Sequence, residues 1–189
     1  MNLADHPTVK GFYAKAATTP SPAAPAKLDA DWLRQLCRNC GADDLGLVEI
    51  GRAALDDQRD DILRFFPATK TLLSFVCRMN REPVRSTARS VANLEFHHAG
   101  DKVNEVARQV VAALERHGVG ALNPSMGFPM EMDRFPEKIW VVSHKPVAVA
   151  AGLGHLGIHR NVIHPRFGNF IVLGTVLIDA DSGSDTFLR

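Results

Sequence analysis

Residues 144–179 read HKPVAVAAGLGHLGIHRNVIHPRFGNFIVLGTVLID. The start of this stretch, residues 146–151, is predicted to form a short helix that has proline in its first turn and ends at Gly152. Residues 162–164 and 169–179 are rich in apolar and β-branched side chains, and the turn sequence PRFG lies between them. These features predict two strands joined by a tight turn. The stretch is therefore a helix followed by strands, which favours a mixed fold.

The residues upstream alternate irregularly between helical and strand patterns. Apolar spacing predicts helices over residues 30–40, 53–66 and 87–117, the last of them divided at Gly100 and Asp101. Strands are predicted over residues 45–50, 71–79 and 121–122. Because regular βαβ units are absent from this pattern, we expect an α+β sandwich, with a central and mostly antiparallel sheet flanked by helices, rather than a Rossmann sheet.

Length and charge limit the classes of function. A chain of 189 residues is expected to hold one main domain. Its 22 basic and 21 acidic side chains nearly cancel, so no strong steering toward nucleic acid or an anionic membrane is expected. The sequence contains no apolar run of about 18 residues and no basic start followed by an apolar block. We therefore expect a cytoplasmic protein.

Composition also divides the chain. Residues 1–27 are expected to be a flexible lead-in, because small residues and proline dominate the second half of this segment. Residues 28–180 form the expected domain, and residues 181–189 a tail.

The cysteines are Cys37, Cys40 and Cys77, and this low, odd count favours a reducing compartment. A cubane iron–sulfur cluster needs four thiolates, so this chain alone is not expected to hold one. Cys37 and Cys40 form a C-x-x-C pair late in a predicted helix, where buried filling is favoured over redox chemistry.

The spacing G-x-G-x-x-G occurs at Gly152, Gly154 and Gly157. A dinucleotide site needs a strand before this motif and a helix after it, and the prediction here is the reverse. Two other interpretations stay open. Either the glycines bring backbone close to a broad ligand, or they pack a helix against a sheet.

Several short motifs follow one another in a fixed order. They are Lys145-Pro146-Val147-Ala148, Ala151-Gly152-Leu153-Gly154, Gly157, Ile163-His164-Pro165-Arg166-Phe167-Gly168 and Leu173-Gly174-Thr175-Val176. This run resembles the cobalamin-binding domain of epoxyqueuosine reductases and corrinoid reductive dehalogenases. Upstream, residues 95–118 resemble the helix that precedes the substrate loop in those families, and residues 41–46 fit their early glycine-alanine-aspartate turn.

The resemblance implies an oxidoreductase domain with a fold related to flavin nitroreductases. It also implies cobalamin with its lower base detached, held by backbone and small side chains without a protein ligand to the cobalt. The residues expected to bind the cofactor are Gly152, Leu153, Gly154, Leu156, Gly157, His159, Asn161, Phe167, Gly168, Asn169, Gly174 and Thr175. On this basis Gly154→Val is expected to abolish corrinoid binding and leave the fold intact.

Two departures from the family pattern concern electrons and protons. The families continue into a ferredoxin-like segment with cysteine-rich cluster motifs, which this sequence does not show. Electrons are therefore expected from an iron–sulfur module on a missing segment or on a partner. The aspartate-threonine-x-proline signature of epoxyqueuosine reductases is also not visible, so His144 and Asp133 are the candidate proton donors. The substrate is left open as a small molecule or a nucleoside.

Other interpretations remain beside this one. The domain is alternatively a corrinoid-binding module without turnover, or a reductase that uses flavin or nicotinamide. His155 and His159, with His164 or His144, have a spacing that a zinc site could use, although no H-E-x-x-H motif supports it. No metal ligand is assigned. One more group consists of the arginines Arg78, Arg81, Arg85 and Arg89. We predict that they form solvated surface or a docking site for an acidic electron donor.

Overall fold

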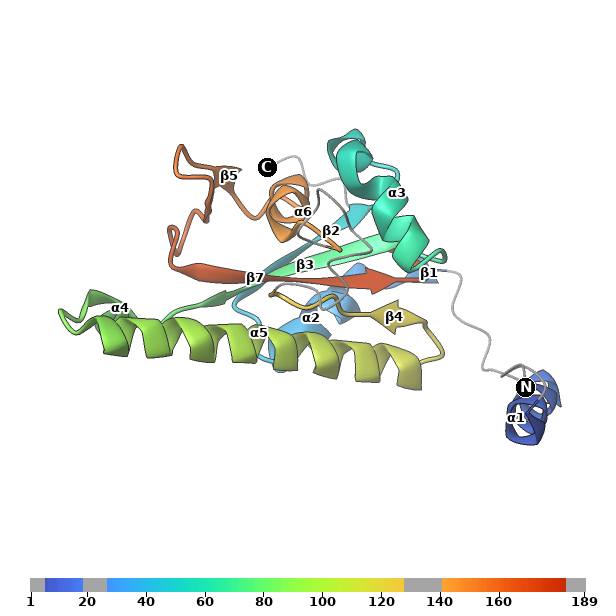
Figure 1. Ribbon diagram of the computed structural model, residues 1–189. Coiled ribbons are helices and arrows are strands. Elements are labelled where there is room, and N and C mark those ends of the chain that lie inside the picture. The colour runs from blue at the N-terminus through green and yellow to red at the C-terminus, as the bar shows by residue number, and fades with distance from the viewer. Residues whose placement is uncertain (1–5, 19–26, 128–140, 183–189) are drawn as a thin grey trace.

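The computed structural model describes residues 6–18, 27–127 and 141–182. Figure 1 shows a central sheet with helices on both of its faces. The helices are α1 (Pro7–Thr18), α2 (Ala30–Asn39), η2 (Ala53–Leu55), α3 (Asp56–Phe65), α4 (Arg81–Arg85), α5 (Arg89–Arg116) and α6 (His144–Ala150). The strands are β1 (Lys27–Leu28), β2 (Asp44–Glu49), β3 (Thr71–Arg78), β4 (Ala121–Leu122), β5 (His155–Leu156), β6 (Val162–Ile163), β7 (Ile171–Ile178) and β8 (Asp181–Ser182). The candidate proton donor Asp133 lies outside the described residues.

The central sheet has the strand order β2-β3-β7-β4, and each neighbouring pair is antiparallel. Two smaller pairs accompany it, β1 with β8 in parallel and β5 with β6 in antiparallel. The structure confirms the expected α+β class and the mostly antiparallel sheet.

The long strands bury both of their faces, which explains their continuous apolar sequence. Successive side chains point to opposite faces of a strand. Leu73, Phe75 and Val176 belong to the larger core, which α2 and α5 share, while Leu72 and Leu177 pack in a second core with Val147 of α6. The sheet is therefore the middle of three layers, with α2 and α5 on one side and α3 and α6 on the other (Figure 1).

Local sequence signals determine where the helix α2 begins and ends. The Asp29 carboxylate accepts a hydrogen bond from the backbone N–H of Trp32 at 2.6 Å, which caps α2. After the helix, Gly41 has a φ of +107°, a conformation that favours glycine. Both features confirm the predicted start and stop of this helix.

The predicted division at Gly100 and Asp101 is wrong, because α5 runs without a break from Arg89 to Arg116. Gly100 is buried, and a Cβ atom there would come 2.9 Å from the methyl group of Met126. The glycine therefore admits a neighbouring side chain to the helix surface and does not end the helix. The short helix α4 was not predicted, and α1 occupies part of the segment expected to be a lead-in.

The structure also differs from the predicted hairpin of residues 162–164 and 169–179. The turn between them closes through a bridge from His164 to Gly168, but β6 pairs with β5, and β7 pairs with β3 and β4.

No described helix is both long and apolar enough to cross a bilayer.

Candidate functional site

A cavity of about 380 Å³ opens at the end of the sheet where β7 begins. Its walls come from the residue after β3, from α5, from the segment after β4, from the start of α6, and from residues 161–173 around β6 and the start of β7. The lining residues are Met79, Phe96, Met126, Ser143, His144, Lys145, Asn161, Val162, Asn169, Ile171, Val172 and Leu173. We call this space the main cavity. It combines an apolar interior with a small set of polar groups, as ligand pockets usually do.

On the polar side of the main cavity, hydrogen bonds from Lys145 connect α6 to the turn before β6. The ammonium group of Lys145 donates to the carbonyl of Arg160 at 2.8 Å and to the Asn161 side-chain oxygen at 3.1 Å. Arg160 has a φ of +58°, so the backbone turns sharply there and presents Asn161. Asn169 also lines the main cavity, and its side-chain amide donates to the His159 Nε2 atom at 3.3 Å. Each of these exposed amides therefore has a hydrogen bond to a neighbouring side chain.

His144 is buried at the inner wall of the main cavity. Its Nε2 atom lies 3.1 Å from the carbonyl oxygen of Ser125, an acceptor, so Nε2 carries the proton and donates it. Its Nδ1 atom lies 2.9 Å from the Thr175 hydroxyl, which then donates to it. Burial lowers the pKa of His144, and the hydrogen bond to Ser125 opposes that shift. Burial thus favours the neutral imidazole of His144, and its two hydrogen bonds hold α6, β7 and residue 125 together.

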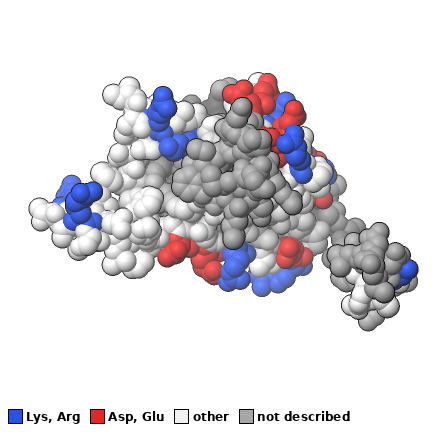
Figure 2. Space-filling view, in the orientation of Figure 1, with Lys and Arg blue, Asp and Glu red and all other residues white. Residues whose placement is uncertain are grey.

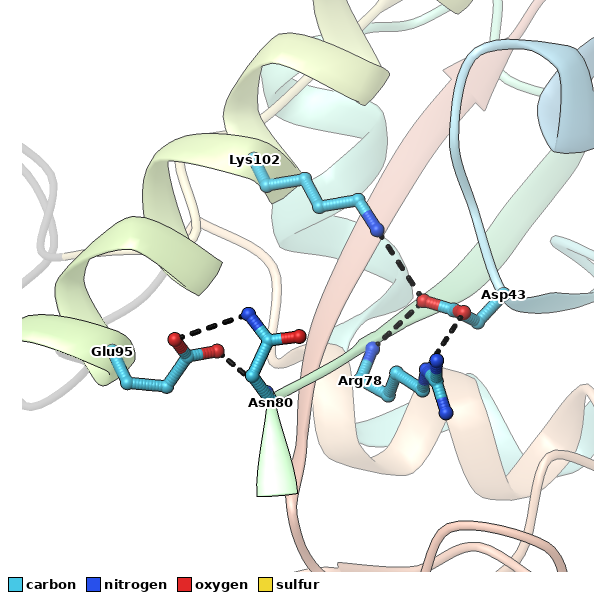
Figure 3. A network of polar contacts seen from close by, with 5 residues as sticks. All are labelled: Asp43, Arg78, Asn80, Glu95 and Lys102. Atoms are coloured by element: carbon cyan, nitrogen blue, oxygen red, sulfur yellow. Dashed lines mark hydrogen bonds and ion pairs between the residues drawn. The ribbon is translucent and has the colours of Figure 1, made fainter. Parts of the chain in front are cut away.

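An ionic network fixes the end of β3 beside the main cavity (Figure 3). One Asp43 oxygen accepts from the backbone N–H of Arg78 at 2.9 Å and from Lys102 at 3.4 Å, and the other lies 3.5 Å from the Arg78 Nε atom. Two residues on, the buried carboxylate of Glu95 accepts from the backbone N–H of Asn80 at 2.6 Å. The turn before β2 and the helix α5 thus both hold the chain that leaves β3.

The glycines predicted to approach a ligand fall into two groups. A Cβ atom at Gly154 would overlap the carbonyl oxygen of Ile163, and one at Gly157 would lie 2.5 Å from the His159 ring. At Gly174 a Cβ atom would lie 2.5 Å from the Cε1 atom of Phe75. The structure thus gives Gly154 and Gly174 a packing reason, which was one of the two interpretations that the sequence left open, whereas the exposed His159 side chain beside Gly157 is free to move aside.

Gly152 and Gly168 form the second group. Both have positive φ, and an added Cβ atom at either one would meet nothing within 4 Å. For Gly154, the close carbonyl and a φ of +153° mean that valine strains the fold itself. The expectation that Gly154→Val leaves the fold intact is therefore wrong.

The structure brings only some of the predicted site residues to the main cavity. His144, Asn161 and Asn169 line it, and His159 reaches it through Asn169. Thr175 lies behind His144 and bonds to it. The remaining candidates lie elsewhere: Leu153 in a buried cluster, Leu156 on the exposed surface, and Phe167 in a neighbouring pocket.

Sequence reasoning missed Lys145 and Phe96 as lining residues. Lys145 was not among the predicted site residues, although a lysine in the first turn of a short helix beside the glycine-rich turn was a usable signal. No sequence signal pointed to Phe96, because this residue of α5 comes close to the other lining residues only in the folded protein. Met126 lines the cavity from the segment after β4 and also packs against Gly100.

The cysteines behave as core residues. Cys37 and Cys77 are fully buried and Cys40 is partly buried, and all are free thiols. Burial raises the pKa of Cys37, and it raises the pKa of Cys77 to about 11. Within the described ranges, no group of three or more histidine, cysteine or acidic side chains is placed to hold a metal ion. The G-x-G-x-x-G motif follows the helix α6, contains the short strand β5 and is followed by β6, so the context of a dinucleotide site is missing.

Solved structures of two kinds of reductase share this fold. The catabolic reductive dehalogenase NpRdhA in complex with 3-bromo-4-hydroxybenzoic acid is 18% identical and superimposes with a TM-score of 0.65 over 87% of this chain. An epoxyqueuosine reductase with a tRNA-Tyr stem loop is 12% identical, with a TM-score of 0.51 over 84% of this chain. A structure described as suggesting a mechanism for B12-dependent dehalogenation is 18% identical, with a TM-score of 0.65 over 87% of this chain. No protein-family model and no curated protein matches the sequence.

These matches confirm the expected resemblance at the level of the fold. The chain spans 22% of the dehalogenase chain in the first of these structures and 47% of the epoxyqueuosine reductase chain. It therefore corresponds to one part of each larger protein.

Proposed function

We propose that this chain is a corrinoid-binding reductase domain of nitroreductase-like fold, and that the main cavity is where cobalamin and a substrate meet. The observation that carries the proposal is the placement of Lys145, Asn161 and Asn169 around one apolar cavity at the end of the sheet. The fold shared with two kinds of reductase, one of them described as B12-dependent, supports the same conclusion.

The residues at the mouth suit this cofactor chemically. A corrin is a broad apolar disc edged with amide groups, so its site needs an apolar surface bordered by hydrogen-bond donors and acceptors. Asn161 and Asn169 supply both, and Met79, Phe96 and Val172 supply the apolar wall. A volume of about 380 Å³ is near the lower end for ligand pockets, which is roughly 300–1,000 Å³. We therefore expect the interior to take a small substrate or one part of the cofactor, and the exposed rim to hold the rest.

The remaining predicted contacts follow from position. Gly152 and Gly168 leave open space beside their backbone, and the exposed side chains of Leu156 and His159 lie on the same glycine-rich segment. We propose that these residues border the cofactor, while Gly154 and Gly174 support them from behind. When bound, cobalamin would supply electron transfer to the substrate, with its electrons received from an iron–sulfur partner or a further segment.

The chain's own residues would bind and orient. Lys145 keeps a positive charge at the cavity wall and holds Asn161 in place through a 3.1 Å hydrogen bond. His144 positions Thr175 and the segment at Ser125, so it acts here as a positioning residue. Asp133, which falls between the described ranges, stays the proposed proton donor. The free cysteines support a reducing, cytoplasmic setting for the protein.

The test is a titration of the full chain with hydroxocobalamin, followed by visible absorbance. We expect saturable binding with a base-off spectrum, weakened about tenfold by Asn161→Ala or by Asn169→Ala, as the loss of one good hydrogen bond predicts. Asn39→Ala is the matched control, because Asn39 lies on α2 and its side chain bonds only to Gln35 among the described contacts. No spectral change at saturating cobalamin would refute the proposal, and flavin retained through purification would favour a flavin reductase.

A corrinoid-binding module without turnover is the second candidate. Both ring nitrogens of His144 are engaged by protein groups, which leaves this residue no proton directed into the cavity. Cobalamin binding with no reduction of any substrate, even with a reduced iron–sulfur donor, would favour this module over the enzyme.

A further inference from the structure

A second pocket lies on the other side of Met79, which lines both spaces. It measures about 270 Å³, and its lining in the described part of the chain includes no acidic side chain. We call it the arginine pocket. Its lining residues are Arg78, Met79, Arg81, Val84, Arg85, Arg166, Phe167 and Phe170. Half of these residues carry a guanidinium group, and the rest form an apolar floor.

Three separate elements bring the guanidinium groups together. Arg78 ends β3, Arg81 and Arg85 belong to α4, and Arg166 lies on the turn before β7. The spacing of four residues places Arg81 and Arg85 on one side of α4. Like charges at this spacing repel each other, so the arrangement is unfavourable unless an anion lies between them.

Among the described side chains, few acidic groups offset the positive charge of the arginine pocket. The Asp43 carboxylate forms an ion pair with Arg78, and it also forms an ion pair with Lys102 at 3.4 Å (Figure 3). Within the described residues, no acidic side chain forms an ion pair with Arg81, Arg85 or Arg166. Figure 2 likewise shows basic side chains at the α4 end of the molecule with no acidic neighbour on the visible face.

The wall that carries Arg166 is rigid. His164 is buried, its Nε2 atom lies 3.1 Å from the Asp44 carboxylate, and its Nδ1 atom accepts the backbone N–H of Arg166 at 3.1 Å. The His164 ring stacks on Phe167 with ring centres 4.7 Å apart, and the Arg166 guanidinium lies 5.0 Å above the Phe167 ring. Stacking on the ring restricts the guanidinium and leaves its edge available to an anion.

We propose that the arginine pocket binds the phosphate group of a small phosphorylated ligand whose apolar part lies on Phe167 and Phe170. Guanidinium groups bind phosphate through paired, charge-assisted hydrogen bonds, and several of them around one concave site favour a group with two negative charges. The apolar floor fits a small molecule better than the flat, wet surface of a docked protein. This inference goes beyond the corrinoid proposal and does not depend on it.

The experiment is calorimetric titration of the full chain, without cobalamin, at an ionic strength held constant with chloride. Inorganic phosphate and phenyl phosphate are the probes. We expect both to bind at one site, with phenyl phosphate the tighter of the two because its ring covers the apolar floor. Arg85→Gln and Arg166→Gln should each weaken binding about tenfold, the loss of one charge-assisted contact. Arg108→Gln is the control, since Arg108 lies on α5 and pairs with Glu105 at 2.8 Å; it should bind like the wild type.

Other outcomes would overturn the proposal. They are no binding of either phosphate, or an equal loss of affinity in Arg108→Gln, which would indicate a diffuse charge effect. Binding of a hexaglutamate peptide with no competition from phenyl phosphate would indicate an acidic protein partner instead. Thermal melts in the absence of phosphate confirm that each variant is folded. The corrinoid titration on the same samples fails or succeeds separately, so the two proposals are distinguishable.

Discussion

Replacing Gly174 with alanine distinguishes a packing role for this glycine from a direct role in binding. An alanine Cβ atom would lie 2.5 Å from the Phe75 Cε1 atom, 2.9 Å from Cε2, and closer still to Cζ. Ordinary carbon contacts are about 3.5–4.0 Å, so the ring would have to move by roughly 1 Å. Phe75 is fully buried in the core shared with α2 and α5, which leaves the ring no free direction.

The magnitude follows from these contacts. Overpacking of a filled core costs about 1–3 kcal/mol, and replacing glycine inside a strand returns roughly 0.5–1 kcal/mol. We therefore expect Gly174→Ala to lower the free energy of unfolding by about 1–2 kcal/mol. Phe75→Leu makes room at the same place, so the double variant should be more stable than the sum of the single changes predicts, by about 1 kcal/mol.

The assay is urea unfolding of the full chain, followed by circular dichroism and by tryptophan fluorescence to check that the two transitions coincide. Gly51→Ala is the matched control, because a Cβ atom there would meet nothing within 4 Å. Full stability of Gly174→Ala together with a loss of cobalamin affinity would refute the packing argument and return Gly174 to the ligand site. Additive effects in the double variant would refute the contact with Phe75.

Three further predictions concern titration, thiol chemistry and capping. Burial lowers the pKa of His144 below its ordinary 6.5, so the unfolded chain takes up a proton there before the folded protein does, and the free energy of unfolding falls as the pH drops below about 6.5. Urea unfolding between about pH 7.5 and about pH 5 should show a smaller loss of stability for His144→Gln than for the wild type; equal losses would contradict this. A thiol reagent at neutral pH should modify Cys40 in the folded protein and reach Cys37 and Cys77 only in urea, because Cys37 and Cys77 are fully buried whereas Cys40 is partly exposed; rapid modification of all of them in the native protein would count against these positions. Asp29→Ala removes the N-cap of α2 and should cost about 1 kcal/mol in the same unfolding assay, whereas Asp29→Asn should cost less.

The sequence predicted those elements whose signals are local. The start of α2 after Asp29, its end before Gly41 and the continuous apolar run of β3 each depend on neighbouring residues, and each appears in the structure. The prediction at Gly100 failed, because its reason for being glycine is Met126, which is distant in the chain and meets it only in the folded protein.

The same limit applies to the site. Asn161 and Asn169 were predicted through a resemblance, and both line the main cavity. The glycines around them carry the recognisable spacing, yet the lack of a side chain at Gly154 and Gly174 leaves room for the Ile163 carbonyl and the Phe75 ring. Glycine marks a close approach of atoms, but the sequence alone does not tell whether the approaching group is a ligand or the protein itself.

The most direct test of the corrinoid proposal is a structure of the full chain crystallised with cobalamin. The proposal predicts density for the corrin at the mouth of the main cavity, with its amide groups bonded to Asn161 and Asn169. Density for the cofactor at any other surface, or an empty main cavity in crystals grown at saturating cobalamin, would contradict it.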